Sequence, residues 1–339
     1  MITLITSRIH DNRPDIALLQ DFEQFCSKNS AWAVKKGAVL FSPRSISSRV
    51  YSACHTMMRP VLKRFKFNGA VISLGLPYRK TLLSKTFPYY ALDCDLRVLW
   101  TYDVWEPDYA SVELMVREAG INLLLLSSYQ ATVHFSKLNI PDCEVHWVAE
   151  TVNSDDYRQK PWAQRSTDLL SFGRTWGKFH NAIHDSCIDS NINYRFQEQT
   201  AMIDTAVHGL KGALQFPTWS DFVTGLSDSK ICICFPRSVT HPALAGNVST
   251  LTLRYLQAMA SKCLILGAAP LDVKYALDYD PVVEVNWDDP AGQIKHILAH
   301  PEAYQELIEK NYRTVVDLFH HKNSIDKIDL LVRNRLNSI

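Results

Sequence analysis

The chain has 339 residues, of which 47% are hydrophobic and 21% are charged, and its formal net charge is +1. This length allows two domains, and the near-neutral charge gives no reason to expect a nucleic acid partner. Neither G-x-G-x-x-G nor G-x-x-x-x-G-K-[ST] occurs, so we expect no conventional nicotinamide site or P-loop. The first residues lack the basic head and apolar core of a signal peptide, and no apolar run is long enough to span a membrane. A cytoplasmic protein is therefore expected.

The first half of the chain alternates short apolar runs with amphipathic segments, which is typical of a parallel α/β sheet. We predict helices over 14–27, 111–119 and 129–137, the second of which ends at Gly120. Strands are predicted over 1–6, 39–42, 70–74, 97–103, 121–126 and 145–148. Together these elements predict a doubly wound α/β domain.

Residues 57–67 interleave basic side chains with large apolar ones, and Pro60 should limit any helix there. One interpretation is a solvated face over a stripe of core residues. The other is a peripheral contact with anionic lipid at the inner face of a membrane. The basic residues of that contact would be Arg59, Lys63, Arg64 and Lys66.

Two carboxylates, Asp103 and Glu106, follow the strand predicted over 97–103, where they should line the ligand edge of the sheet. A carboxylate in that place could take the proton of an acceptor hydroxyl. The alternative is that both cap the helix that follows, because Pro107 suits a first helical turn.

The second half begins after a polar linker over 150–167 and repeats the α/β pattern. Domain boundaries are placed at 1–155, 156–320 and 321–339, the last being a helical tail that could pack back on the first domain. Strands are predicted over 168–173, 231–235 and 264–266, and helices over 178–188, 221–226, 251–260 and much of 290–339. Cys232 and Cys234 lie inside a predicted strand, so we interpret them as reduced core residues and expect no metal site.

The loop after the strand over 231–235 is rich in polar residues. In open α/β sheets ligands bind at the carboxyl ends of strands, and the free N–H groups of a helix start suit an anion. The loop and the helix behind it hold Arg237, His241, Asn247, Ser249, Thr250 and Arg254. Ser249 or Thr250 could equally be the helix N-cap, and Arg254 could instead form a structural salt bridge. A second group of this kind, Gly173, Arg174 and Lys178, follows the strand over 168–173.

The run Thr252, Leu253, Arg254, with its helix, small-residue turn and strand over 264–266, resembles the carboxyl-terminal domain of group-1 glycosyltransferases, most of all the CgeB-like branch. Residues 147–157 are similar to that family's linker, and 171–174 to the start of its donor domain. Many retaining members carry two glutamates eight positions apart, where this chain has Ser249 and Gln257, and Lys262 replaces the usual glycine.

The resemblance implies a GT-B fold, in which two Rossmann-like domains face each other across a cleft. It also implies a metal-independent hexosyltransferase that uses a nucleotide sugar as substrate and needs no cofactor. The acceptor would be a glycan or a lipid-linked sugar, in bacterial surface polysaccharide assembly. Because the glutamate pair is missing, the sequence leaves open whether the transfer retains or inverts the configuration at the anomeric carbon of the sugar.

The residues that we predict fall into two sets. The catalytic candidates are Asp103, Glu106 and His241. Donor-binding candidates are Gly173, Arg174, Lys178, Arg237, Asn247, Ser249, Thr250, Arg254 and Gln257. Two other functions remain open: a nucleotide-sugar epimerase, and a non-catalytic glycan-binding or scaffolding subunit, which the replacement of the glutamates by Ser249 and Gln257 favours.

Overall fold

The computed structural model describes residues 1–6, 14–37, 45–173, 175–197 and 215–338, with only the backbone of 14–18. The chain divides into two compact units. The first consists of Met1–Glu150, His241–Thr250 and His321–Ile339, and the second of Thr151–Thr240 and Leu251–His320. Among the described helices, none is long and apolar enough to cross a membrane.

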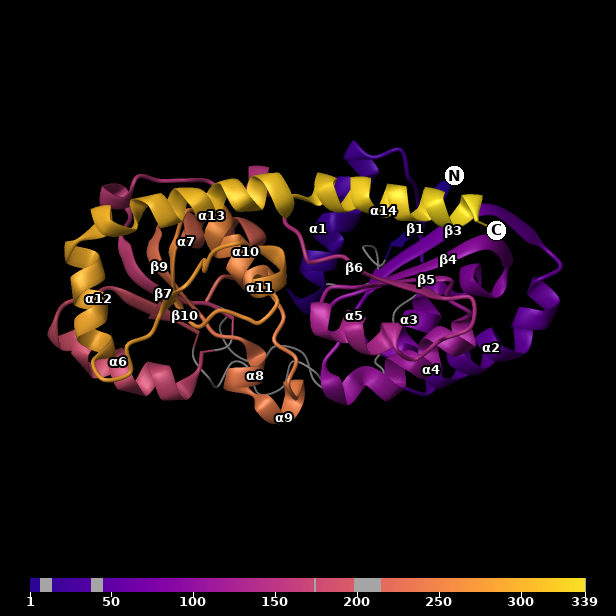
Figure 1. Cartoon of the computed structure of the whole chain (residues 1–339), viewed down its shortest axis with the longest axis horizontal. Coiled ribbons are helices and arrows are strands. Elements are labelled where there is room, and N and C mark those ends of the chain that lie inside the picture. Colours follow the sequence, from indigo (N-terminus) through magenta and orange to yellow (C-terminus); the bar gives the residue numbers. More distant parts are fainter. Residues whose placement is uncertain (7–13, 38–44, 174, 198–214, 339) are drawn as a thin grey trace. The chain divides into compact units, whose positions relative to one another are not determined.

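The first unit is built on a sheet of six described strands in the order β2-β1-β3-β4-β5-β6, with parallel pairing throughout (Figure 1). These strands are β1 (Ile2–Thr6), β2 (Ala33–Lys36), β3 (Lys66–Gly75), β4 (Asp93–Thr101), β5 (Leu123–Leu126) and β6 (Glu144–Trp147). The helices of this unit are α1 (Pro14–Asn29), α2 (Ile46–Leu62), α3 (Arg79–Thr86), α4 (Tyr109–Ala119), α5 (Tyr129–Ser136), α9 (Pro242–Ala245) and α14 (His321–Asn337). Short 3-10 turns add η1 (Tyr89–Ala91) and η2 (Glu106–Asp108).

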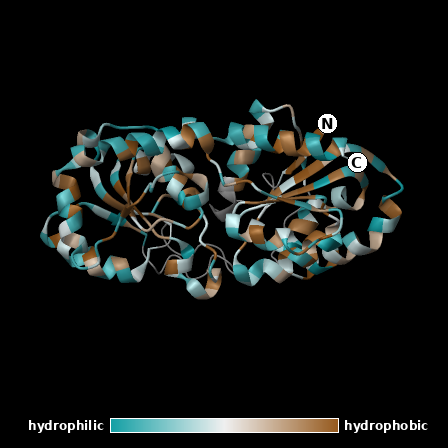
Figure 2. Ribbon diagram, viewed as in Figure 1, coloured by the Kyte–Doolittle hydropathy of each residue, from teal (hydrophilic) through white to brown (hydrophobic). Residues whose placement is uncertain are grey.

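Burial on both faces explains the apolar strands of this sheet. All four leucines of β5 have no exposed surface, and neither have Leu4 and Ile5 of β1. Figure 2 shows the central strands of each unit as hydrophobic and the outer turns of most helices as mixed or hydrophilic. Such continuous apolar strands are what a parallel sheet covered by helices requires.

The second unit has a smaller parallel sheet, whose described strands follow the order β11-β10-β9-β7-β8. They are β7 (Thr167–Ser171), β8 (Tyr194–Phe196), β9 (Ser229–Cys234), β10 (Leu264–Gly267) and β11 (Val283–Glu284). The helices are α6 (Gly177–Asp189), α7 (Trp219–Ser227), α8 (Arg237–Thr240), α10 (Leu253–Ala260), α11 (Val273–Ala276), α12 (Pro290–Ala299) and α13 (Gln305–Leu318). The 3-10 turns are η3 (Ser154–Asp156), η4 (Trp162–Gln164) and η6 (Pro301–Tyr304).

Most predicted elements are confirmed, with ends that move by a few residues. The elements that were not predicted are strands β2, β8 and β11 and helices α2, α3, α8, α9 and α11. The strand predicted over 39–42 lies outside the described residues. Pro60 does not limit the helix, because α2 continues through it to Leu62. Proline removes a donor and crowds the preceding turn, but here it comes two residues before the helix end.

The observed units differ from the predicted domain boundaries at residues 151–155 and 241–250. Residues 241–250 were counted with the second domain, yet their contacts place them in the first unit. Residues 321–339 also belong to the first unit. The segment predicted as a linker contains η3 and η4, and all of it after Glu150 is part of the second unit.

Candidate functional site

The second unit has a topological switch point between β7 and β9. The chain leaves β7 for β8 on one side, then returns to pair β9 with β7 on the other side. Loops that leave the carboxyl ends of two such strands diverge and open a crevice between them, where open α/β sheets bind ligands. Gly173 follows β7 at this point and Arg237 follows β9, so the fold brings two of the predicted donor-binding loops to one place.

Arg254 reaches this switch point from the first turn of α10. Its guanidinium carbon lies 5.8 Å from the ring centroid of Phe172. A Cβ atom at Gly173 would be 2.9 Å from Nη2 of Arg254, and Gly173 has a φ of 71°, a conformation that favours glycine. Burial raises the pKa of the Cys234 thiol to about 12, and the positive charge of Arg254 acts in the opposite direction. The guanidinium therefore sits by the ends of both β7 and β9.

The charge of Arg254 is not neutralised within the part of the chain that the structure describes. Neither a salt bridge nor a hydrogen bond from Arg254 to another described residue is present, so the structural salt bridge considered from the sequence is not found there. A half-buried guanidinium without a carboxylate retains its capacity to bind an anion such as a phosphate.

The other two residues predicted in the loop after β7 are Arg174 and Lys178. Arg174 lies outside the described residues. Lys178 is exposed on the first turn of α6, and its Nζ lies 4.3 Å from the ring centroid of Trp287. That cation–π contact holds the ammonium at the edge of a cluster formed by Trp176, Phe235 and Trp287.

A buried carboxylate that the sequence did not reveal supports the start of α10. Asp272 follows β10, has no exposed surface, and accepts a 3.4 Å hydrogen bond from the backbone N–H of Leu251. The N-cap of α10 is Thr252, without a side-chain capping bond, so the prediction of Ser249 or Thr250 as N-cap is wrong. The helix begins at Leu253, two residues later than predicted.

Gln257 of α10 is 4% exposed, and Tyr255 beside it is buried with its hydroxyl donating a 2.8 Å hydrogen bond to the carbonyl of Ala268. This bond joins α10 to the loop after β10. Gln257 thus stands on a firmly packed helix, at the position where the family resemblance expects a residue that contacts the donor.

The segment 241–250 packs on the first unit through apolar and polar contacts. Ala245 and Val248 form a small buried cluster with Trp105, against which Tyr109 also packs. Gln130 of α5 bridges the segment, since its Nε2 donates to the carbonyl of Asn247 at 2.8 Å and its Oε1 accepts from the N–H of Ser249 at 2.7 Å. Sequence reasoning missed Gln130, because nothing near it in the chain signals a partner more than a hundred residues away.

The predicted catalytic residues are all in the first unit. Glu106 is exposed at the start of η2, and its Oε2 accepts a 2.8 Å hydrogen bond from the N–H of Asn247. Asp103 is half-buried after β4 with a φ of 54°, a conformation that costs free energy for a residue other than glycine. His241 is half-buried and is the N-cap residue of α9.

These positions divide the predicted residues between the two units. Gly173, Lys178, Arg237, Arg254 and Gln257 belong to the second unit, whereas Asn247, Ser249 and Thr250 belong to the first with Asp103, Glu106 and His241. In this structure the N–H groups of Asn247 and Ser249 are already bound to Glu106 and Gln130. Among the predicted donor-binding residues, Arg254 at the β7–β9 switch point is thus a cation without an ionic partner in the described part of the chain.

The first unit has its own switch point, between β1 and β3, and sequence reasoning also missed the ion pair there. Lys85 of α3 is 2% exposed, lies 3.4 Å from Oε1 of the fully buried Glu23, and donates to the carbonyl of Leu74. Burial lowers the pKa of Lys85, and the adjacent Glu23 opposes that shift. Thr6, the last residue of β1, donates its hydroxyl to Glu23.

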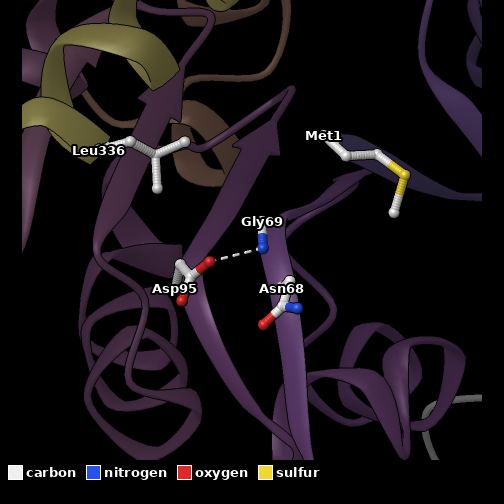
Figure 3. A pocket seen from close by; sticks show the side chains of 5 residues that line it. All are labelled: Met1, Asn68, Gly69, Asp95 and Leu336. Carbon is white, nitrogen blue, oxygen red and sulfur yellow. Dashed lines mark hydrogen bonds between the residues drawn. The ribbon is translucent and has the colours of Figure 1, made fainter.

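One cavity of the first unit, of about 570 Å³, lies at the opposite edge of the sheet (Figure 3). Its lining residues are Met1, Asn68, Gly69, Asp95 and Leu336. Asp95 accepts a 2.6 Å hydrogen bond from the N–H of Gly69. Because the cavity is at the amino-terminal ends of β1 and β4, it is separate from the ligand edge.

Metal-ligating side chains do not gather anywhere in the described ranges, where no group of three His, Cys, Asp or Glu could hold an ion. The cysteines Cys232 and Cys234 of β9 are free thiols with no exposed surface. They fill the core of the second unit, as predicted.

Comparisons with known proteins identify the fold. No family model matches the sequence, and no curated protein matches it. Sucrose-phosphate synthase from Thermosynechococcus elongatus is similar in structure, with a TM-score of 0.59 at 10% identity over 100% of this chain and 99% of that one. HepE from Anabaena, solved with UDP and glucose, gives a TM-score of 0.60 at 9% identity over 98% of this chain and 100% of its own. Another HepE structure, solved with UDP-glucose, gives 0.54 at 10% identity, over 100% of this chain and 99% of that one.

These likenesses confirm the predicted fold class. Two Rossmann-like α/β units, each with a parallel sheet, define the GT-B fold found in glycosyltransferases. The resemblance to the CgeB-like branch stays a prediction.

Proposed function

We propose that this protein is a glycosyltransferase that moves a sugar from a nucleotide-sugar donor to an acceptor hydroxyl. The observation that carries the proposal is the guanidinium of Arg254 at the β7–β9 switch point, without an ionic partner among the described residues. A pyrophosphate is an anion that a guanidinium can bind through two parallel hydrogen bonds. The likeness to GT-B structures, one of them solved with UDP-glucose, supports the same function.

The reaction breaks the bond between the sugar C1 and the donor oxygen and forms a bond between C1 and the acceptor oxygen. The leaving nucleoside diphosphate gains negative charge in the transition state, so cations that bind it there accelerate the reaction. Arg254 would carry this role with Arg237, Arg174 and Lys178, without a metal. The acceptor proton would pass to Asp103 or Glu106, and His241 is a further candidate for proton transfer.

The remaining details of the proposal come from the family resemblance and, for the nucleotide, from the HepE structures. The donor sugar would be a hexose, with UDP as its nucleotide, which is the nucleotide in the HepE structures. The acceptor would be a glycan or a lipid-linked sugar in bacterial surface polysaccharide assembly. A lipid-linked acceptor would bring the protein to the membrane surface, where the basic residues around 63–66 would touch lipid headgroups.

Nucleotide binding tests the proposal. UDP and UDP-glucose should raise the Tm by several degrees, since a ligand at a hundred times its Kd stabilises a protein by about 2.7 kcal/mol. Arg254→Gln should weaken binding by at least about tenfold, because it removes the charge-assisted hydrogen bonds. Arg313→Gln, which removes an exposed arginine of α13, is the matched control and should bind as the unchanged protein does.

A second measurement separates transfer from its rivals. Release of UDP that depends on an added acceptor supports the glycosyltransferase. Interconversion of the free nucleotide sugar would instead identify an epimerase. Binding without turnover would identify a non-catalytic subunit, which the buried Ser249 and Gln257 in place of two glutamates favour. If no nucleotide changes the Tm, the proposed donor site at Arg254 is contradicted.

A further inference from the structure

Helix α2 has its polar and apolar faces reversed. Its buried residues are Ser48, Ser52 and His55, all small or polar. Arg59 also turns inward, where it donates to the carbonyl of Glu118, and burial lowers its pKa. An ordinary surface helix buries its apolar stripe against the core. Helix α2 instead turns small and polar residues toward the core.

Four apolar residues of α2 lie on one face that points away from the unit. Ile46 is 78% exposed, Val50 52%, Met57 75% and Val61 47%. Their spacing of four, seven and four residues places them on one face of a helix. Phe65, just after the helix, is 64% exposed and extends the same region. We call these five side chains the outer stripe of α2.

Positive charge surrounds the outer stripe. Arg49 lies within α2, Lys63 and Arg64 follow it, and all three are exposed and form no ion pair with another described residue. Lys66 lies 3.5 Å from Asp95, so its charge is partly balanced. Residues 24–92 contain no aspartate or glutamate, but they contain twelve lysines and arginines, in a chain whose net charge is only +1.

We propose that the outer stripe of α2 is the surface by which this protein docks on an anionic phospholipid bilayer. Ile46, Val50, Met57 and Phe65 would enter the boundary between headgroups and acyl chains, while Arg49, Lys63 and Arg64 bind the phosphates. This inference rests on the proposed function and deepens it by naming the apolar side chains that would contact the membrane. It also corrects the set expected from the sequence, because Arg59 faces the core and does not belong to the contact.

The charge pattern favours a bilayer over a second copy of the chain. Two copies that met through the outer stripe would bring their unpaired arginines and lysines together, and like charges at close range repel. An anionic bilayer satisfies the apolar side chains and the cations together. Each basic residue near such a surface strengthens the binding.

The experiment is co-sedimentation of the full chain with vesicles, measured without donor or acceptor. The protein should sediment with vesicles of phosphatidylcholine that contain about one third phosphatidylglycerol, and should stay in solution with phosphatidylcholine alone. High salt should weaken the binding, because it screens the phosphates. Val50→Ser combined with Met57→Ser should reduce the vesicle affinity by about tenfold or more.

The matched control is Leu114→Ser combined with Leu330→Ser, which removes two similarly exposed apolar side chains from α4 and α14 of the same unit. These variants should bind vesicles as the unchanged protein does, and both pairs should keep the original Tm. The inference is overturned if the protein does not bind anionic vesicles. It is also overturned if the variant with Val50→Ser and Met57→Ser binds them as strongly as the unchanged protein. A dimer that the Val50 and Met57 substitutions dissociate, with no vesicle binding, would show a protein partner instead.

The outcomes for docking and for sugar transfer are independent. If UDP-glucose binds and vesicles do not, only the docking surface is wrong. If vesicles bind and no nucleotide does, the docking surface stands and the proposed glycosyltransferase does not.

Discussion

At the scale of single residues, the first unit contains several ionisable side chains in places that water cannot reach. His55 of α2 has no exposed surface, and neither ring nitrogen has a hydrogen-bond partner among the described residues. Burial, and next the charge of Arg59, lower its pKa from 6.5 to about 4. Arg97 and Arg79 act in the same direction, whereas Glu118 opposes them. The folded protein therefore holds His55 neutral.

The pH dependence of stability should reveal this histidine. Between pH 6.5 and 4, His55 is protonated in the unfolded chain but stays neutral in the folded chain. The free energy of unfolding therefore falls as the pH is lowered. The shift predicts a loss of about 3 kcal/mol from His55 across that window. His55→Gln should flatten the decline of Tm with falling pH, and His184→Gln, at a partly exposed site, is the control for replacing a histidine. An equal decline in all three proteins would contradict the assignment.

At the scale of elements, the segment 241–250 shows how a distant part of the chain completes the first unit. Glu106 and Gln130, on η2 and α5, together hold its backbone through three hydrogen bonds of 2.7 or 2.8 Å. A hydrogen bond within a folded protein contributes about 0.5–1.5 kcal/mol to stability. These side chains therefore determine the path of the loop between β9 and α10.

Gln130→Ala should loosen this segment. We expect the amides of residues 246–249 to exchange with deuterium at least about tenfold faster, because local opening loses two hydrogen bonds. Gln293→Ala is the matched control, since Gln293 bridges the N–H of Asn286 and the carbonyl of Glu284 in the same manner within the second unit. Its exchange should rise only near residues 284–286. Unchanged exchange at 246–249 in Gln130→Ala would show that the apolar cluster with Trp105 alone holds the segment.

At the scale of the whole molecule, the first unit is assembled from three stretches of chain. Helix α14 contributes the buried Ile325, Ile328 and Val332. Polar contacts add to them: Trp32 donates to Asp329 at 2.7 Å, and Arg335 lies 3.1 Å from Glu144. The first unit is thus complete only when the end of the described chain has been synthesised.

Removal of residues 321–339 should destabilise the first unit by several kcal/mol, since each buried aliphatic side chain contributes about 1.5–3 kcal/mol. Urea unfolding followed by tryptophan fluorescence would measure the change. Removal of 338–339 alone is the control and should have no effect, because these residues follow α14. If the shortened chain unfolds at the original urea concentration, α14 is dispensable for the first unit.

Local patterns in the sequence were sufficient for much of the fold. Apolar runs such as Leu123–Leu126 predict buried strands, and Gly120 marks the end of α4 with a φ of 62°. The same patterns failed at α2, where the apolar residues point outward and Pro60 lies inside the helix. Periodicity shows that a helix has an apolar face, but it does not show which way that face points.

The candidate site was predicted in part. The residues Gly173, Arg237 and Arg254 were found because strands of one parallel sheet place their carboxyl ends at the same edge. Sequence reasoning did not find four other residues: Gln130, Asp272, Glu23 and Lys85. The partner of each lies far away in the sequence or in a loop that carries no recognisable motif.

The sequence by itself determined the two α/β units, their parallel strands and the basic loops that follow them, since burial and turn chemistry act over a few neighbouring residues. Only the tertiary structure decided that Arg254 stands by Gly173 without a carboxylate from the described residues, that residues 241–250 join the first unit, and that α2 turns its apolar face outward. These three facts depend on contacts between segments far apart in the chain. Such contacts depend on the packing of whole elements, which no local pattern specifies.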